Sequence, residues 1–166
     1  MVSCDTWNMG CNGGILPWAW SYIAKTGIAT DECVPYVSGD GVTVPSCSKT
    51  CADGSAKKKY TCSGNYIKAS GVSAVQSLIY AGGPVETGFT VYEDFLSYKS
   101  GIYAYTSGDK KGGHAVKIVG WGQENGINYW IVANSWSTRW GEEGFFRIQW
   151  GQCGIDDATY ACNPQL

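Results

Sequence analysis

His114 and Asn134 are the residues whose types and spacing point most directly to chemistry. His114 is the only histidine of the 166-residue chain, and an imidazole, with an unperturbed pKa of about 6.5, can take up or release a proton near neutral pH. An asparagine amide oxygen can accept a hydrogen bond from the imidazole N–H, which fixes the tautomer without adding charge. An asparagine has this role in Cys-His-Asn nucleophilic sites. A lone histidine is also compatible with an ordinary surface or core position.

The two residues stand at the ends of two apolar runs. His114 begins the run HAVKIVGWG, and Asn134 ends the run INYWIVAN. Both runs are rich in β-branched residues, which predicts strands of a largely buried sheet. The intervening residues 122–126, GQENG, have the composition of a hairpin turn. An antiparallel hairpin brings the beginning of its first strand beside the end of its second. We therefore expect His114 and Asn134 to be neighbours, although 20 positions separate them.

The residues around this pair fit a site that binds a peptide. Gly112 and Gly113 directly precede the histidine, and glycines allow a substrate backbone to approach closely. Trp136 and Trp140 follow the asparagine. We expect them to cover the pair and exclude water, which would strengthen its hydrogen bonds.

The remaining elements predict an α+β fold in two parts. Residues 1–65 comprise a glycine-rich loop, a helix from Pro17 to a stop at Gly27, and a long aperiodic region. Residues 66–166 contain a helix at 73–80 capped by Ser70 or Ser73, a short helix at 92–99, a basic turn at 107–113 and several short strands. Strands joined by tight turns suggest a small antiparallel β-barrel, with a cleft between the two parts.

Composition excludes several classes of function. A net charge of −2 gives no reason to expect nucleic acid or an anionic membrane as partner. No apolar run approaches the length of about 18 residues that a membrane span needs. Eight cysteines with one histidine argue against a Cys/His zinc site, in spite of the Cys47-x₃-Cys51 spacing, and favour disulfides in an oxidising compartment. The sequence indicates no metal and no cofactor. The first residues, MVSCDTWN, lack the basic and apolar regions of a signal peptide.

Several long segments resemble the papain-like cysteine peptidases, and within them the cathepsin B group. The matching segments, in the order of the family, are SCDTWNMGCNGG, ECVPY, CSKTC, GGPVETGFTVYEDFLSYKSGIY, GGHAVKIVGWG, NYWIVANSW and RWGEEGFFRI. They cover nearly the whole chain. The resemblance implies a papain-like fold with an incomplete helical domain and a barrel domain. It also implies cysteine-type proteolysis with polypeptide substrates, cystatin-type inhibitors as partners, and a lysosomal, vacuolar or secreted location.

The resemblance assigns roles to individual residues. His114 would be the catalytic base and Asn134 its orienting partner, with Trp136 and Trp140 shielding them. Gly13, Gly14 and Gly113 would contact the substrate backbone, and Trp136 would also belong to the substrate-binding residues. In cathepsin B one residue near the C-terminus helps to set which substrate side chain the second pocket accepts. The matching position here is Ala158, which predicts a preference for apolar substrate side chains. A shift of one residue would place Asp157 at this position instead. The disulfides implied are Cys4–Cys47, Cys33–Cys51 and Cys62–Cys162, which leaves Cys11 and Cys153 without partners.

One expected feature of the family is missing from these residues. The nucleophilic cysteine of the family lies in a Gln…Cys-Gly-Ser-Cys-Trp segment upstream of SCDTWNMGCNGG. The chain begins at Met1, so we expect it to lack the nucleophile and to be inactive alone. The region from Cys33 to Cys51 is short and has no histidine, which favours an endopeptidase over the dipeptide-removing activity of cathepsin B. A catalytically inactive binding homologue, a truncated fragment of a peptidase and a disulfide-rich structural domain remain alternatives.

Overall fold

The computed structural model describes residues 1–165, which form two units. The first contains Met1–Tyr66 together with the C-terminal tail from Cys162, and the second contains Ile67–Ala161. The tail belongs to the first unit because β9 (Pro164–Gln165) pairs with β1 (Thr61–Cys62). None of the described helices is long and apolar enough to cross a membrane.

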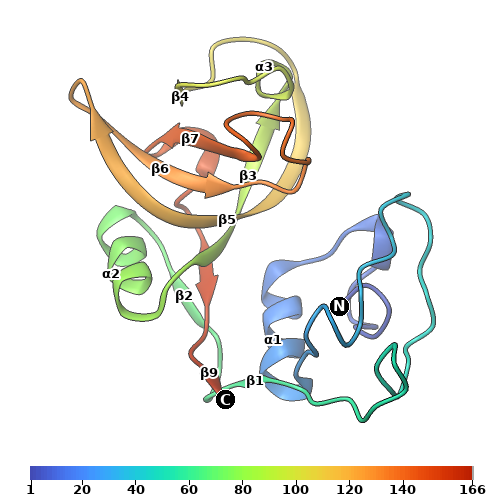
Figure 1. Ribbon diagram of the computed structural model, residues 1–166. Helices are drawn as coiled ribbons and strands as arrows, with labels where there is room; N and C mark the ends of the chain where they lie inside the picture. Colours follow the sequence, from blue (N-terminus) through green and yellow to red (C-terminus); the bar gives the residue numbers. More distant parts are fainter. Residues whose placement is uncertain (166) are drawn as a thin grey trace. The chain divides into compact units, whose positions relative to one another are not determined.

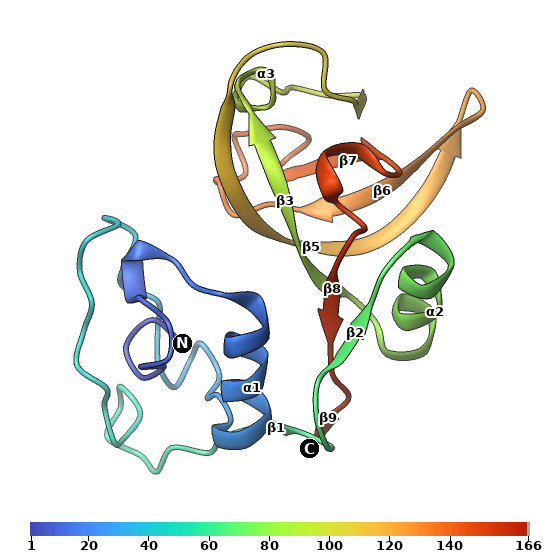
Figure 2. The same ribbon diagram turned by 180° about the vertical axis from the view of Figure 1, so that it is seen from behind.

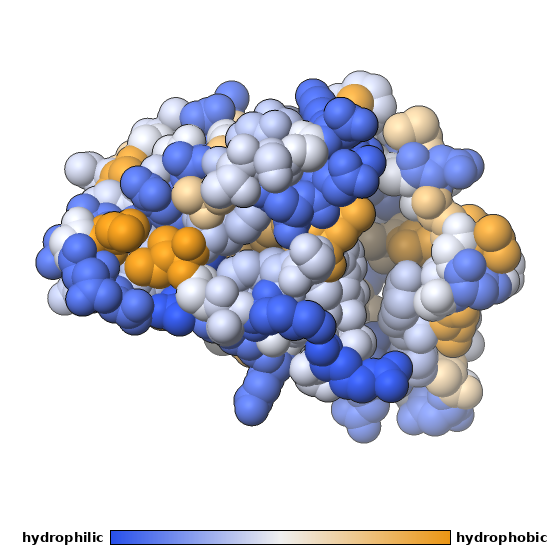
Figure 3. Space-filling view, turned by 90° about the horizontal axis from the view of Figure 1, so that it is seen from above, coloured by the Kyte–Doolittle hydropathy of each residue, from blue (hydrophilic) through white to orange (hydrophobic). Residues whose placement is uncertain are grey.

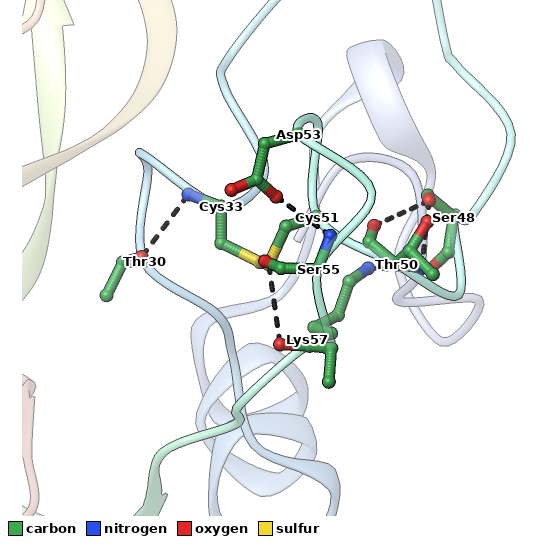
Figure 4. Close-up of a disulfide and its surroundings, with 9 residues drawn as sticks. Thr30, Cys33, Ser48, Thr50, Cys51, Asp53, Ser55 and Lys57 are labelled. Carbon is green, nitrogen blue, oxygen red and sulfur yellow. Dashed lines mark hydrogen bonds between the residues drawn. A yellow bond between two sulfur atoms is a disulfide. The ribbon is translucent and has the colours of Figure 1, made fainter.

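The first unit has little regular structure and is held by disulfides. A 3₁₀ turn, η1 (Gly10–Asn12), precedes α1 (Leu16–Thr26), which has a proline in its first turn and ends at Gly27, where φ is +76°. The three disulfides are the pairs that the resemblance implies: Cys4–Cys47, Cys33–Cys51 and Cys62–Cys162. Figure 4 shows the surroundings of the second pair, where Lys57 Nζ donates to the Ser48 carbonyl at 2.6 Å. Among the described residues of this unit, the buried hydrophobic ones are Tyr22 and Cys62, so the cross-links do much of what an apolar core does elsewhere.

The second unit is built on one seven-stranded sheet (Figure 1). Its strand order is β2-β8-β3-β5-β6-β7-β4. The strands are β2 (Ile67–Ala69), β3 (Val85–Tyr92), β4 (Ile102–Tyr103), β5 (Lys110–Glu124), β6 (Ile127–Ala133), β7 (Phe145–Gln149) and β8 (Thr159–Ala161). A 3₁₀ turn, η2 (Gln152–Gly154), separates β7 from β8. Burial alternates strictly along β3, as expected for a strand with one face on the core.

Helices lie on both sides of this sheet. Helix α2 (Val72–Gly82) contacts β5 and β2, and the four-residue α3 (Glu93–Leu96) follows β3 on the other side (Figure 1 and Figure 2). The core between them includes Phe89, Phe95, Trp130 and Phe146, all at most 4% exposed. Polar residues cover most of the face in Figure 3, where hydrophobic residues form several small clusters.

The expected closed barrel is wrong, because the sheet is open. Its edge strands are β2 and β4, and in the described residues they do not pair with each other. Strand β4 has only two residues and joins β7 in parallel, so it cannot continue the antiparallel meander that a barrel would need. The mixed α+β class with an antiparallel-rich sheet is correct.

Smaller differences from the sequence predictions have local causes. Helix α2 begins after Gly71, with no side-chain cap from Ser70 or Ser73. The helix expected at 92–99 stops at Leu96, because the Tyr98 side chain turns into the core. The basic segment expected as a turn at 107–113 belongs to β5 from Lys110 onward, since its backbone pairs with β3.

Candidate active site

The hairpin of β5 and β6 brings His114 and Asn134 together as the sequence predicts. His114 lies near the beginning of β5, opposite Phe89 of β3, and Asn134 directly follows β6. His114 Nε2 lies 2.8 Å from Asn134 Oδ1. The turn between the strands is tighter than the GQENG segment suggests: Gly122 to Glu124 still pair with β6, and only Asn125 and Gly126 form the turn.

The hydrogen bonds around Asn134 fix the tautomer of the imidazole. The backbone N–H of Ser135 donates to Asn134 Oδ1 at 2.8 Å, which identifies this atom as the amide oxygen. An oxygen without a proton can only accept, so His114 Nε2 donates to it. In the neutral ring Nδ1 is then left unprotonated and is the basic atom. Both residues are half-buried, so the ring is fixed but not sealed off.

Two aromatic rings flank the imidazole. The Trp136 ring stacks on it with centroids 5.0 Å apart and planes inclined by 24°, and Phe89 lies at 6.1 Å. Both rings contact Phe95 of α3, at 5.6 Å and 5.1 Å. The sequence predicted Trp136 at the pair but gave no role to Phe89 or Phe95. The alternation along β3 was the available signal for Phe89; no short pattern marks Phe95.

Trp140 supports this arrangement from further away. It packs edge-on against Trp136 at 5.1 Å, and its Nε1 donates to the Leu96 carbonyl at 3.3 Å. Trp140 therefore lies behind Trp136 and has no ring contact with His114 in the described residues. Trp140 is thus linked to the imidazole through Trp136.

The glycines predicted to face a substrate lie in both units. Gly113 is exposed on β5, with open space where a side chain would stand. In the first unit, Gly13 has φ of +97°, and a Cβ on Gly14 would lie 2.5 Å from Asn8 Oδ1. That Asn8 oxygen accepts the Ile15 N–H at 2.7 Å, so the loop excludes a side chain at Gly14. In the described residues the Gly14 amide and carbonyl have no backbone partner.

Ala158 directly precedes β8 in the second unit. Its carbonyl accepts a hydrogen bond from Thr87 Oγ1 at 3.3 Å, and the following residue, Thr159, pairs with Thr87. Strand β3 in turn pairs with β5, where Gly88 faces Ala115. Ala158 is therefore two strands away from the beginning of β5, on the same sheet as His114.

Six of the eight cysteines are in disulfides, which leaves Cys11 and Cys153 free. Burial, followed by the negative charge of Asp94, raises the pKa of the Cys153 thiol above its usual value. Such a thiol is a poor nucleophile at neutral pH. Cys11, in the first unit, has its Sγ 3.5 Å from the Thr43 carbonyl. Among residues 1–165, no group of three or more His, Cys, Asp or Glu side chains could hold a metal ion.

Comparison with known proteins gives the family. The model of the papain family cysteine proteases matches residues 1–162. The chain belongs to the papain family. Cathepsin B-like CP2 of Giardia intestinalis is 44% identical over an alignment of 166 residues, which covers 97% of this chain and 55% of that protein. Cathepsin B of Dictyostelium discoideum is 40% identical over 178 residues, covering 99% and 57%. The chain thus spans a little over half the length of these relatives.

Solved structures of the papain family have the same fold. The structure of proCathepsin B S9 from Trypanosoma congolense matches with a TM-score of 0.92 and 38% identity, covering 99% of this chain and 59% of that one. The proform of the ragweed pollen cysteine protease Amb a 11 matches with a TM-score of 0.82 and 30% identity, covering 98% and 49%. The papain-like fold and the cathepsin B-like resemblance predicted from the sequence are therefore confirmed.

Proposed function

We propose that the protein carrying this chain is a cathepsin B-like cysteine endopeptidase, and that His114 is its catalytic base. The observation that carries the proposal is the 2.8 Å hydrogen bond between His114 Nε2 and Asn134 Oδ1 beneath Trp136. It leaves Nδ1 as the atom that exchanges a proton with a nucleophile. Papain-family membership supplies the reaction class, and polypeptides are its substrates.

The mechanism uses the imidazole twice. His114 Nδ1 takes the proton of a cysteine thiol, and the resulting thiolate attacks the scissile carbonyl. The imidazolium then gives its proton to the leaving amine, which departs and leaves the acyl-enzyme thioester. Water, losing a proton to His114 Nδ1, hydrolyses this thioester, which releases the carboxylic acid product and restores the cysteine thiol. The hydrogen bond to Asn134 keeps the proton on Nε2 throughout, so that only Nδ1 gains and loses a proton, and Trp136 limits water access to this hydrogen bond. Gly113, Gly13 and Gly14 would accept the extended substrate by backbone pairing.

The nucleophile, in this proposal, is a cysteine outside the 166 residues. Six cysteines are in disulfides, and the raised pKa of Cys153 disfavours its thiolate. The other free cysteine, Cys11, lies within SCDTWNMGCNGG, and the resemblance puts the nucleophile upstream of that segment. The chain alone is then inactive.

Two further points concern the specificity of the proposed peptidase and its location. The short disulfide-closed segment from Cys33 to Cys51 lacks histidine, which supports endopeptidase action, and Ala158 favours an apolar side chain in the second pocket. Three disulfides fit a lysosomal, vacuolar or secreted protein, and cystatin-type inhibitors would be its partners.

A second candidate is a non-catalytic homologue that binds peptides. The raised pKa of Cys153 favours it, because this is the only free cysteine described in the second unit. Such a protein would keep the glycine contacts but would have no chemical need for an oriented imidazole. The His114–Asn134 hydrogen bond therefore favours the peptidase.

The test uses the protein translated from the complete reading frame of the gene. A peptidyl epoxide that alkylates active-site thiolates should label it, and His114→Ala should abolish labelling and reduce peptide hydrolysis at least 10³-fold, since removal of a catalytic-triad member costs about that much or more. Lys117→Ala, on the same strand and exposed, is the control and should retain activity. Absence of labelling in the unsubstituted protein, with peptide binding intact, would favour the binding homologue. Full activity of His114→Ala would refute the base assignment.

A further inference from the structure

The turn that leads into β7 is hydrogen-bonded to the backbone of Asn134. Glu142 and Phe145 close this turn with two reciprocal backbone hydrogen bonds of 2.9 and 3.0 Å. Its central residues, Glu143 and Gly144, have φ of +56° and +92°, as in the tight turns of hairpins. The Gly144 carbonyl accepts the Asn134 N–H at 3.0 Å. The position of the asparagine therefore depends on the position of this turn.

The same turn also holds the tryptophan behind the imidazole. The Gly144 N–H donates to the Trp140 carbonyl at 2.8 Å, and Trp140 packs edge-on against Trp136, which stacks on His114. Two independent paths thus run from Gly144 to the imidazole, one through Asn134 and one through the tryptophans. A displacement of the turn would act on both contacts of the ring.

Glu142 fixes the turn to two neighbouring segments. Its carboxylate accepts from Arg147 Nη2 at 2.8 Å and from Arg147 Nε at 3.0 Å, a two-point contact with β7. It also accepts the Gly101 N–H at 2.9 Å, from the segment just before β4. The side chains of Glu142 and Arg147 are only 28% and 23% exposed. The hydrogen bonds from Arg147 outweigh partial burial and lower the pKa of the Glu142 carboxyl, so it stays charged.

We propose that Glu142 is a positioning residue for the His114 imidazole, acting through the Gly144 carbonyl on Asn134 and through Trp140 on Trp136. The expected loss of catalysis rests on the proposed function, whereas the expected loosening of Asn134 and of the imidazole does not. Catalytic groups must be held to within about 0.5 Å, and a misplacement of about 1 Å can reduce the rate about 100-fold. Loosening this turn should therefore reduce kcat while substrate binding is largely kept.

The chain offers a matched control on the same arginine. Glu124 also contacts Arg147, at 3.0 Å through Nη1, but its side chain is 53% exposed and lies at the end of β5, away from the turn. Exposed ion pairs of this kind contribute little to the stability of the fold. Glu124→Gln and Glu142→Gln remove the same charge from the same partner, and only Glu142→Gln disturbs the turn.

The positional effect can be measured by NMR on the 166-residue chain, because His114 is its only histidine. In the unsubstituted chain the imidazole ¹⁵N shifts should report the Nε2–H tautomer, and the Asn134 amide should exchange slowly with solvent. Glu142→Gln should speed exchange of the Asn134 amide at least tenfold and mix the tautomers, and Glu142→Ala should do so more strongly. Glu124→Gln should stay within twofold of the unsubstituted chain, and Val85 and Thr87 amides in β3 should remain protected in all variants.

The outcomes separate this inference from the proposed function. The positioning role would be overturned if Glu142→Gln and Glu124→Gln had the same exchange rate of the Asn134 amide and the same imidazole ¹⁵N shifts. If Glu142→Ala fails to fold, Glu142→Gln alone decides. In the protein translated from the complete reading frame, Glu142→Gln should lower kcat at least tenfold with KM within about threefold, and Glu124→Gln should change neither. Absence of the NMR effect in Glu142→Gln refutes the positioning role, whereas full activity of His114→Ala refutes only the proposed catalysis.

Discussion

Phe95 should contribute more to the stability of the second unit than any exposed residue of its helix. The ring is completely buried and contacts six aromatic rings: Phe89, Tyr98, Tyr103, Trp136, Trp140 and Phe146. Replacement of a buried phenylalanine by alanine costs about 3–5 kcal/mol, depending on how far the cavity collapses. Large flat rings held by their own packing cannot close the space, so Phe95→Ala should lose about 4–5 kcal/mol. Phe95→Leu should lose about 1–2 kcal/mol, since most of the volume is kept.

Urea unfolding followed by tryptophan fluorescence measures this difference. The control is Leu96→Ala on the same helix, whose side chain is 49% exposed and whose backbone carbonyl still accepts from Trp140. It should lose less than about 0.5 kcal/mol. A loss below 2 kcal/mol in Phe95→Ala, or one equal to that of Leu96→Ala, would refute the view that Phe95 supports both rings beside His114.

Three further substitutions test other parts of the structure. Burial raises the pKa of the Asp94 carboxyl, but hydrogen bonds from Thr106, Tyr103 and Ser107 outweigh it and hold the pKa below its usual value. The charged Asp94 carboxylate therefore stabilises the fold fully above its unfolded pKa of about 3.9, and this stabilisation is lost as the pH falls through its lower pKa in the folded state. Asp94→Asn should make the urea midpoint fall less steeply between pH 5 and pH 2.5. An unchanged slope would contradict this. Replacing both Cys62 and Cys162 by serine opens a link between residues 100 positions apart and should lower the free energy of unfolding by about 4 kcal/mol; a loss under 1 kcal/mol would show that the β1–β9 pairing suffices. In the active protein, Ala158→Glu should shift substrate preference in the second pocket from leucine toward arginine, and unchanged kcat/KM ratios would place that pocket elsewhere.

The central hairpin was predictable because its information is local. The β-branched residues of 116–119 and 131–132 mark two strands, and an Asn-Gly pair lies between them. The contact between His114 and Asn134 follows from that geometry alone. The turn was overestimated by three residues, because Gly122 resembles a turn residue. Gly122 belongs to β5, and a glycine fits at this position because a Cβ would lie 2.5 Å from the Tyr129 hydroxyl.

The features that the sequence did not predict depend on contacts between distant residues. Phe95 reaches the site only because α3 packs beneath Trp136 and Phe89. Glu142 and Arg147 are five positions apart, but their importance comes from Gly101 and from the bond between Gly144 and Asn134. The open sheet follows from the parallel pairing of β4 with β7, which no local pattern specifies. The disulfide pairs came from the resemblance to the family, since cysteine spacing alone leaves many pairings open.

The Cys62–Cys162 disulfide joins the chain at the two places where it passes between the units. Residues 62–162, closed by this disulfide, therefore form a covalent ring that contains His114, Asn134 and the whole seven-stranded sheet. A single backbone cut anywhere within this ring, for example by another peptidase during maturation, would leave both products attached to each other. The resulting two-chain form would keep its sheet strands tethered, and it would separate on a gel only after reduction.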